Sequence, residues 1–103
     1  MSEGKTRNKK MPKVPPEALD HVWREIETLG DPRLDVEKLG RFCYITHAGS
    51  PLCRLAYRGE METWDFAIYK YSTGSYANSV FGFSRYGTVA KLVATAMNAY
   101  NLT

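Results

Sequence analysis

The sequence predicts an α+β domain: an N-terminal helix, a four-stranded antiparallel meander sheet, and a C-terminal helix packed on one sheet face. Two observations support this. Apolar residues recur at helical spacing near both ends of the chain, and they alternate with polar residues along segments separated by turn residues. Because a chain of 103 residues usually holds a single core, we expect one domain over residues 15–103.

Residues 1–14 are predicted to be a disordered basic arm, since nearly every position is charged, small or polar. Residues 1–16 carry five basic side chains and one acidic side chain, whereas residues 17–40 carry seven acidic and three basic ones. The arm, which includes Lys9 and Lys10, can therefore contact a nucleic acid or fold back on its acidic neighbour. The sequence leaves both alternatives open.

The first helix is predicted over residues 16–29. Proline suits its first position, and apolar side chains recur along one face of it. Gly30 follows where a left-handed cap residue is expected, and Asp31-Pro32 ends the helix. Residues 31–40 are then expected to be a connection that includes one short helical turn over 35–39.

Two strands are predicted over residues 41–48 and 52–58, joined by a turn at Gly49-Ser50-Pro51. Side chains alternate between the two faces of each strand. The sequence does not decide which face of this hairpin is buried, because one residue more or less in the loop inverts the faces.

Two cysteines lie on these neighbouring strands. In one register Cys43 faces Leu55 and Cys53 faces Ile45, which makes the thiols diagonal neighbours rather than a bonded pair. We interpret both as small buried hydrophobic residues.

The central hairpin is predicted over residues 64–83, with a two-residue turn at Thr73-Gly74. Its inner face is aromatic and its outer face is polar but rich in tyrosine. The predicted register pairs Phe66 with Phe81, Trp64 with Phe83, and Tyr71 with Tyr76.

The last helix is predicted to begin after Ser84 or Thr88 and to end near Asn98 or Tyr100. The side opposite its apolar stripe carries small residues where a surface helix usually carries charges. Such a side is covered either by the first helix or by a second copy of the chain, as a homodimer. The candidate interface residues are Ala90, Ala94 and Met97.

The solvent face of the sheet is predicted to combine arginines with tyrosines, a mixture that suits single-stranded nucleic acid. We therefore expect a non-enzymatic binding domain, with a protein interaction or self-association module as the alternative. The predicted nucleic-acid contacts are Lys9, Lys10, Arg54, Arg58, Tyr69, Lys70, Tyr71 and Arg85.

No catalytic or metal pattern is evident, so we expect no cofactor. His21 and His47 form no known metal spacing with the cysteines. A Cys53–His47 pair across the hairpin is geometrically possible, but the sequence supplies no electropositive setting or third group for a nucleophilic thiol. No apolar run approaches the roughly 18 residues that span a bilayer, and we expect a cytoplasmic protein.

The order of helix, strands and helix is similar to that of the double-stranded RNA-binding domain, and Ala90-Lys91 echoes the second helix of that family. The resemblance implies a related arrangement of elements. It does not carry over that family's phosphate site, because the family opens this helix with a lysine cluster and the segment Ser84-Arg85-Tyr86-Gly87 has one basic residue.

Overall fold

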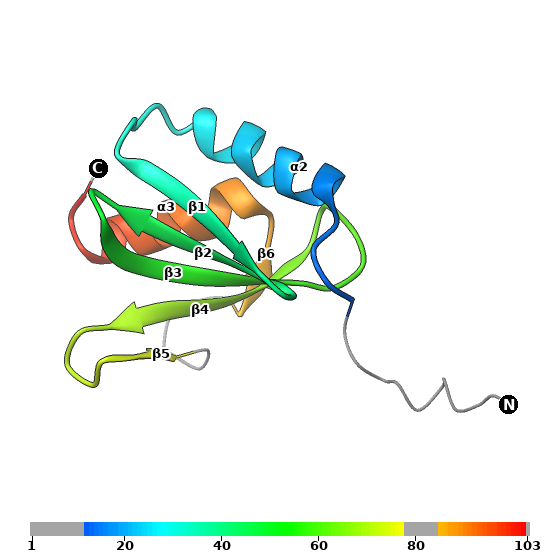
Figure 1. Ribbon diagram of the computed structural model, residues 1–103. Helices are drawn as coiled ribbons and strands as arrows, with labels where there is room; N and C mark the ends of the chain where they lie inside the picture. Colours follow the sequence, from blue (N-terminus) through cyan, green and yellow to red (C-terminus); the bar gives the residue numbers. More distant parts are fainter. Residues whose placement is uncertain (1–11, 78–84, 103) are drawn as a thin grey trace, which may run out of the picture.

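The computed structural model describes residues 12–77 and 85–102, which fold as an α+β protein (Figure 1). The elements are α2 Pro16–Glu27, β1 Leu34–Leu39, β2 Phe42–His47, β3 Ser50–Tyr57, β4 Trp64–Lys70, β5 Ser75–Ala77, β6 Tyr86–Gly87 and α3 Val89–Ala99. The strands pair antiparallel in the order β1-β2-β3-β4-β5, and β6 also pairs with β4. The predicted fold class and meander order are confirmed, with six strands over these residues instead of four.

Both helices begin as the sequence indicates. Pro16 occupies the first turn of α2, and the Thr88 hydroxyl accepts a hydrogen bond from the backbone N–H of Lys91 at the start of α3. Gly30 adopts a φ of 71°, in the left-handed region, just after the end of α2. Local capping rules therefore located these ends to within two or three residues.

Residues Leu34–Leu39 form an edge strand, so the predicted connection with a helical turn over 35–39 is wrong. β1 pairs with β2 along its whole length, from Leu34 opposite His47 to Leu39 opposite Phe42. Of its side chains only Leu34 is buried, which leaves a weak alternation pattern. Pairing with a distant partner, rather than local preference, sets the conformation of this segment.

The first hairpin has the register predicted for its cysteines. Cys43 lies opposite Leu55 and Ile45 lies opposite Cys53, and both thiols are free and buried. The buried face is therefore the one that carries the cysteines, which answers the question that the sequence left open. Phe42, Tyr44 and Arg54 project from the other face by alternation.

The turn of this hairpin is Ala48-Gly49 rather than residues 49–51. Both residues have positive φ angles, 53° for Ala48 and 85° for Gly49, as a two-residue type I′ loop requires. His47 and Ser50 close the loop as paired residues. Glycine adopts this conformation freely, whereas alanine is strained in it.

Ala48→Asn is expected to stabilise the protein by about 0.5–1 kcal/mol, because asparagine tolerates the left-handed conformation that this turn imposes. Urea unfolding should show a higher midpoint with an unchanged slope. Gly49→Ala, which introduces the same strain at the next position, should lower the midpoint. An unchanged midpoint for Ala48→Asn would mean that the turn is not strained.

The second hairpin has a longer loop than predicted. Tyr69 lies opposite Tyr76 and Lys70 opposite Ser75, so four residues, 71–74, connect the strands. The Lys70 carbonyl accepts hydrogen bonds from the N–H groups of residues 73 and 74, which closes this loop. The predicted pairing of Tyr71 with Tyr76 is therefore wrong by two residues, a shift that leaves each side chain on its predicted face.

The partners predicted for Phe66 and Trp64, namely Phe81 and Phe83, lie outside the described residues. Trp64 pairs instead with Gly87 of β6, and Asp65 pairs with Tyr86. The predicted inner face is nevertheless correct at Trp64 and Phe66, which are 0% and 3% exposed.

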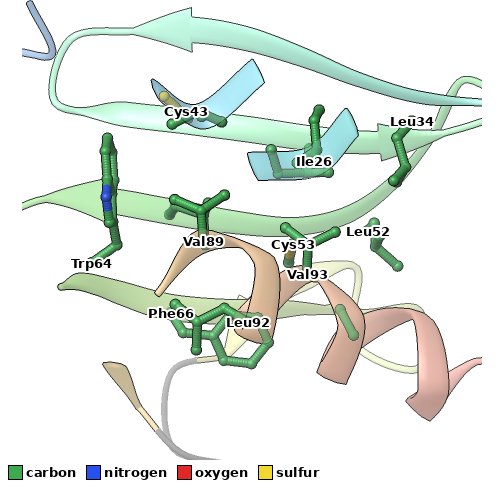
Figure 2. Packing of buried hydrophobic residues seen from close by; sticks show 14 of the residues in the cluster. Ile26, Leu34, Cys43, Leu52, Cys53, Trp64, Phe66, Val89, Leu92 and Val93 are labelled. Carbon is green, nitrogen blue, oxygen red and sulfur yellow. The ribbon is translucent and has the colours of Figure 1, made fainter. Parts of the chain in front are cut away.

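The core lies between the sheet and the two helices, which cover the same sheet face (Figures 1 and 2). Val14, which we placed in the basic arm, belongs to this core: it is 2% exposed, and its N–H donates to the Gly40 carbonyl at 3.0 Å. The packed domain thus begins before residue 15. Lys9 and Lys10 lie outside the described residues.

Candidate functional site

The outer face of the sheet, the side away from α2 and α3, gathers aromatic and charged side chains from four neighbouring strands. Strand alternation fixes their direction, because the residues between them point into the core. The outer-face residues of β2 to β5 used below are Phe42, Tyr44, Arg54, Ala56, Asp65, Ala67, Tyr69 and Tyr76.

Five aromatic rings form a continuous row across this face. Consecutive ring centroids lie 5.9 Å apart from Phe42 to Tyr44, 5.6 Å from Tyr44 to Tyr76, 5.0 Å from Tyr76 to Tyr69 and 4.8 Å from Tyr69 to Tyr71. The contacts are tilted or edge-to-face, the favourable geometries for aromatic pairs. Each ring of this aromatic row keeps part of its surface exposed.

The C-terminal segment holds one end of the aromatic row in place. The Tyr100 hydroxyl donates to the carbonyl of Tyr69, and the Tyr71 hydroxyl donates to the carbonyl of Pro51 at 2.6 Å. The Tyr71 and Tyr100 rings meet edge-to-face at 5.7 Å. These contacts fix the orientation of the rings before any ligand arrives.

Arg54 is inserted among the rings. Its guanidinium carbon lies 4.4 Å from the Phe42 centroid and 5.1 Å from the Tyr76 centroid, within cation–π range of both. The planar guanidinium is thus positioned by two rings, while its N–H groups stay available to acceptors.

Arg58 is engaged differently. Its guanidinium lies 3.6 Å from the Asp65 carboxylate, and both side chains are about two-fifths exposed. This is an exposed surface ion pair, and pairs of this kind contribute about 0–1 kcal/mol.

The structure brings only some of the predicted contacts together. Arg54 and Tyr69 share the outer face, whereas Tyr71 lies in the loop after β4, at the end of the aromatic row, with its ring against Tyr100. Lys70 follows Tyr69 on β4 and so has the orientation of the core residues Phe66 and Ile68, towards the helix side.

Sequence reasoning missed a hollow of about 330 Å³ on the outer face. Three arginines line it: Arg54, the predicted Arg85, and Arg41, which was not predicted. Arg41 directly precedes β2, and the pairing of β2 with β3, which includes a hydrogen bond from the Tyr57 N–H to the Arg41 carbonyl, is what brings it near Ala56. The sequence did contain a signal for this hollow: Ala56 and Ala67 are small residues among large side chains on the outer face.

The predicted interface on α3 is largely covered within the chain. Met97 is 3% exposed and belongs to the core, and Ala90 and Ala94 are half-buried. The backbone N–H of Ala90 donates to the Glu25 carboxylate of α2 at 3.0 Å. The first helix therefore provides much of the cover that the small side of α3 requires.

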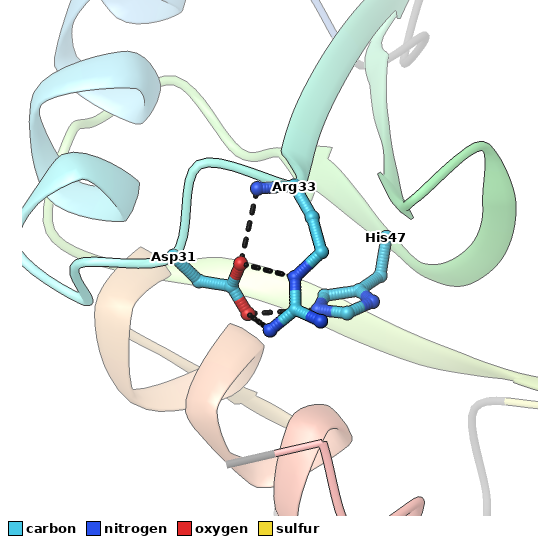
Figure 3. A network of polar contacts seen from close by, with 3 residues as sticks. All are labelled: Asp31, Arg33 and His47. Atoms are coloured by element: carbon cyan, nitrogen blue, oxygen red, sulfur yellow. Dashed lines mark hydrogen bonds and ion pairs between the residues drawn. The ribbon is translucent and has the colours of Figure 1, made fainter.

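A polar network joins the connection between α2 and β1 to the end of β2 (Figure 3). Asp31 accepts from the side chain and backbone N–H of Arg33 at 3.0 Å, and it contacts His47 Nε2 at 2.7 Å. The hydrogen bonds from Arg33 are the main cause that holds the pKa of the Asp31 carboxyl well below its usual range, and His47 adds to the effect. The network ties the connection that follows α2 to the sheet.

His47, the histidine of the Cys53–His47 pair considered above, contacts Asp31 in this network. Burial raises the pKa of both thiols, to about 11 for Cys43, so each stays protonated near neutral pH. Cys53 is fully buried. Neither cysteine has the exposed, electropositive setting of a nucleophile.

Asp31→Asn is expected to destabilise the protein at neutral pH, because the depressed pKa means that the fold stabilises the carboxylate. That stabilisation is present above the ordinary carboxyl pKa of about 4 and is lost as pH falls towards the lower folded-state value. Urea midpoints of the two proteins should therefore differ at about pH 7, and the difference should shrink steadily as the pH falls below about 4 towards the folded-state value.

Asp35→Asn is the matched control, since among the described residues the exposed Asp35 carboxylate accepts only from the neighbouring N–H of Val36. It should change the midpoint less than Asp31→Asn. Equal midpoints for Asp31→Asn and the unmodified protein at neutral pH would show that the network contributes nothing.

No protein-family model matches this chain, and no curated protein or solved structure shows significant similarity to it. The likeness to the double-stranded RNA-binding domain thus rests only on the order of elements and on Ala90-Lys91. Within residues 12–77 and 85–102, no group of three or more His, Cys, Asp or Glu side chains could hold a metal ion. Over the same residues, neither helix has the length and apolar character needed to cross a bilayer.

Proposed function

We propose that this protein is a non-enzymatic binding domain that takes single-stranded nucleic acid on the outer face of its sheet. The observation that carries the proposal is the aromatic row with the Arg54 guanidinium held between two of its rings. Unpaired bases stack on aromatic rings for about 1–3 kcal/mol each, and arginine neutralises phosphate. The same face therefore offers both kinds of contact that a single strand requires.

The charges of the outer face restrict where the strand runs. Asp35 and Glu37 of β1 lie opposite Thr46 and Tyr44, so the β1 edge of this face is acidic and repels phosphate. The negative charge of Asp65 is offset by the Arg58 guanidinium, which lies 3.6 Å from it. The bound strand consequently lies over β2 to β5, where the rings and Arg54 are.

The basic arm is part of the proposal as an electrostatic contributor. Lys9 and Lys10 lie in the segment with five basic side chains and one acidic one, which would attract phosphate without reading sequence. Folding back on the acidic face of α2 competes with this role. A cytoplasmic location is proposed with it, because two free, buried thiols suit a reducing compartment.

Self-association through α3 has less support. Its central candidate, Met97, is in the core, and Glu25 of α2 already contacts the start of the helix. Sedimentation of the samples used for binding tests this alternative, and a salt-independent dimer would favour it.

The proposal is tested by fluorescence anisotropy with labelled single- and double-stranded oligonucleotides at low and moderate salt. We expect tighter binding of the single strand and an affinity that falls as salt rises. Arg54→Gln should weaken binding and reduce the magnitude of the log–log salt slope by about 0.7, the value for one phosphate contact on a single strand.

Lys91→Gln removes the same charge from an exposed position on α3, away from the outer face, and should leave binding nearly unchanged. Equal losses in the two variants would show that only net charge matters. No binding of the single strand at low salt would reject the proposal.

A further inference from the structure

The hollow on the outer face is a place where the sheet surface is depressed between large side chains. Ala56 lies opposite Phe42 and Asp65, and Ala67 lies opposite Arg54. Both alanines have the outward orientation of their strands, and their methyl groups leave the space that longer side chains would fill. The hollow has a volume of about 330 Å³ and opens to solvent.

Positive charge predominates around this space. Arg41, Arg54 and Arg85 line it, and Asp65 is the only acidic side chain among its described lining residues. Asp65 already faces Arg58 at 3.6 Å, so its charge is largely offset. An anion entering the hollow therefore meets three guanidinium groups with little opposing charge.

Arg41 supplies an observation of a different kind. Its Nε atom is buried and has no hydrogen-bond partner in the part of the chain that the structure describes. Leaving a buried donor unpaired is unfavourable, more so for a charged group. An acceptor supplied by a ligand would remove this penalty.

The two arginines next to Phe42 are held by its ring. The guanidinium carbon of Arg41 lies 4.9 Å from the ring centroid and that of Arg54 lies 4.4 Å from it. Cation–π contact uses the face of a guanidinium and leaves the N–H groups along its edge free to donate. Paired N–H donors of this geometry match the oxygens of a phosphate group.

We propose that the hollow lined by Arg41, Arg54 and Arg85 binds a phosphate group. The inference rests on the proposed function insofar as the phosphate belongs to the bound strand, either as an internal phosphodiester or as a terminal phosphate. It goes beyond that function by assigning the site and by giving Arg41 and Arg85 a role. It also predicts two adjacent subsites, the aromatic row and the hollow, which share Phe42 and Arg54.

The first test needs no nucleic acid. Inorganic phosphate is titrated into the full chain while the side-chain Nε–H resonances of the arginines are followed by NMR. Arg41 should shift in a saturable manner, whereas Arg24, which is exposed on α2, should not. Ala67→Leu, which fills the hollow and changes no charge, should abolish the shift of Arg41.

The second test uses single-stranded oligonucleotides with a 5′-phosphate, with a 3′-phosphate and with neither. Arg41→Lys keeps the charge but removes Nε–H, and it should weaken binding about tenfold, as expected for one hydrogen bond to a charged group. Arg24→Lys is the control. A preference for one phosphorylated end identifies a terminal phosphate, and an equal loss for all three oligonucleotides identifies an internal one.

The outcomes separate the two proposals. If phosphate shifts Arg41 but no oligonucleotide binds, the hollow is an anion site and the proposed function fails. If oligonucleotides bind but phosphate leaves Arg41 unshifted and Arg41→Lys binds normally, the proposed function stands and the phosphate site is overturned.

Discussion

Replacing Trp64 with alanine is expected to lower the free energy of unfolding by about 3–5 kcal/mol, the range for removing a large aromatic side chain from a core. Trp64 is fully buried, and its indole N–H donates to the carbonyl of Met61 at 2.9 Å. Its ring contacts Tyr57 at a centroid distance of 5.2 Å. Because it also pairs with Gly87, it connects β3, β4 and β6.

Small domains have a total stability of about 5–15 kcal/mol, so this loss removes between about a fifth and all of it. Urea unfolding followed by far-UV circular dichroism measures the loss. Trp23→Ala is the matched control: Trp23 is only partly buried on α2, and its removal should cost clearly less. Equal losses at the two positions would contradict the core assigned to Trp64.

Replacing Tyr76 with alanine is expected to weaken the binding of single-stranded nucleic acid by about 1–3 kcal/mol, roughly 5- to 150-fold. Tyr76 is the central ring of the aromatic row, 5.6 Å from Tyr44 and 5.0 Å from Tyr69, and it lies under the Arg54 guanidinium. Its loss removes a stacking surface and releases the arginine. Burial also raises the pKa of Tyr76, so its hydroxyl is neutral near pH 7.

Two control variants test whether the loss of affinity comes from the Tyr76 ring. Their binding is measured by anisotropy at one fixed salt concentration. Tyr76→Phe keeps the ring and should bind nearly as well as the unmodified protein. Tyr86→Ala removes an exposed tyrosine outside the row and should have little effect. If Tyr76→Phe lost as much affinity as Tyr76→Ala, the hydroxyl and not the ring would be responsible.

Local rules were sufficient where a segment's own residues determine its structure. Proline at the start of α2, the Thr88 cap of α3 and the glycine after α2 were readable from the sequence, as was the alternation that buries Trp64 and Phe66. The cysteine register was one that alternation allowed, but the tight loop alone does not set it, because the pairing of β2 with β3 shifts by one residue between Ile45 and Thr46.

The structural predictions were wrong where contacts between segments distant in the sequence determine the conformation. β1 has little alternation and exists because β2 pairs with it. The loop over 71–74 is closed by hydrogen bonds to the carbonyl of Lys70, which composition does not reveal.

The candidate site was only partly predictable for the same reason. Arg54 and Tyr69 were expected because they lie within recognisable strands. Arg41 precedes a strand, and its place at the hollow beside Ala56 depends on the pairing of β2 with β3. Outer-face alanines predict a depression only once the register is known.

The most direct test of the central claim is NMR chemical-shift mapping of the unmodified protein during titration with an unlabelled single-stranded oligonucleotide. If the outer face is the binding surface, the largest changes occur at Phe42, Tyr44, Tyr69 and Tyr76 and at the Arg54 side chain, while exposed residues of α2 and α3 change little. Changes confined to the helices, or none at saturating concentration, would contradict the claim.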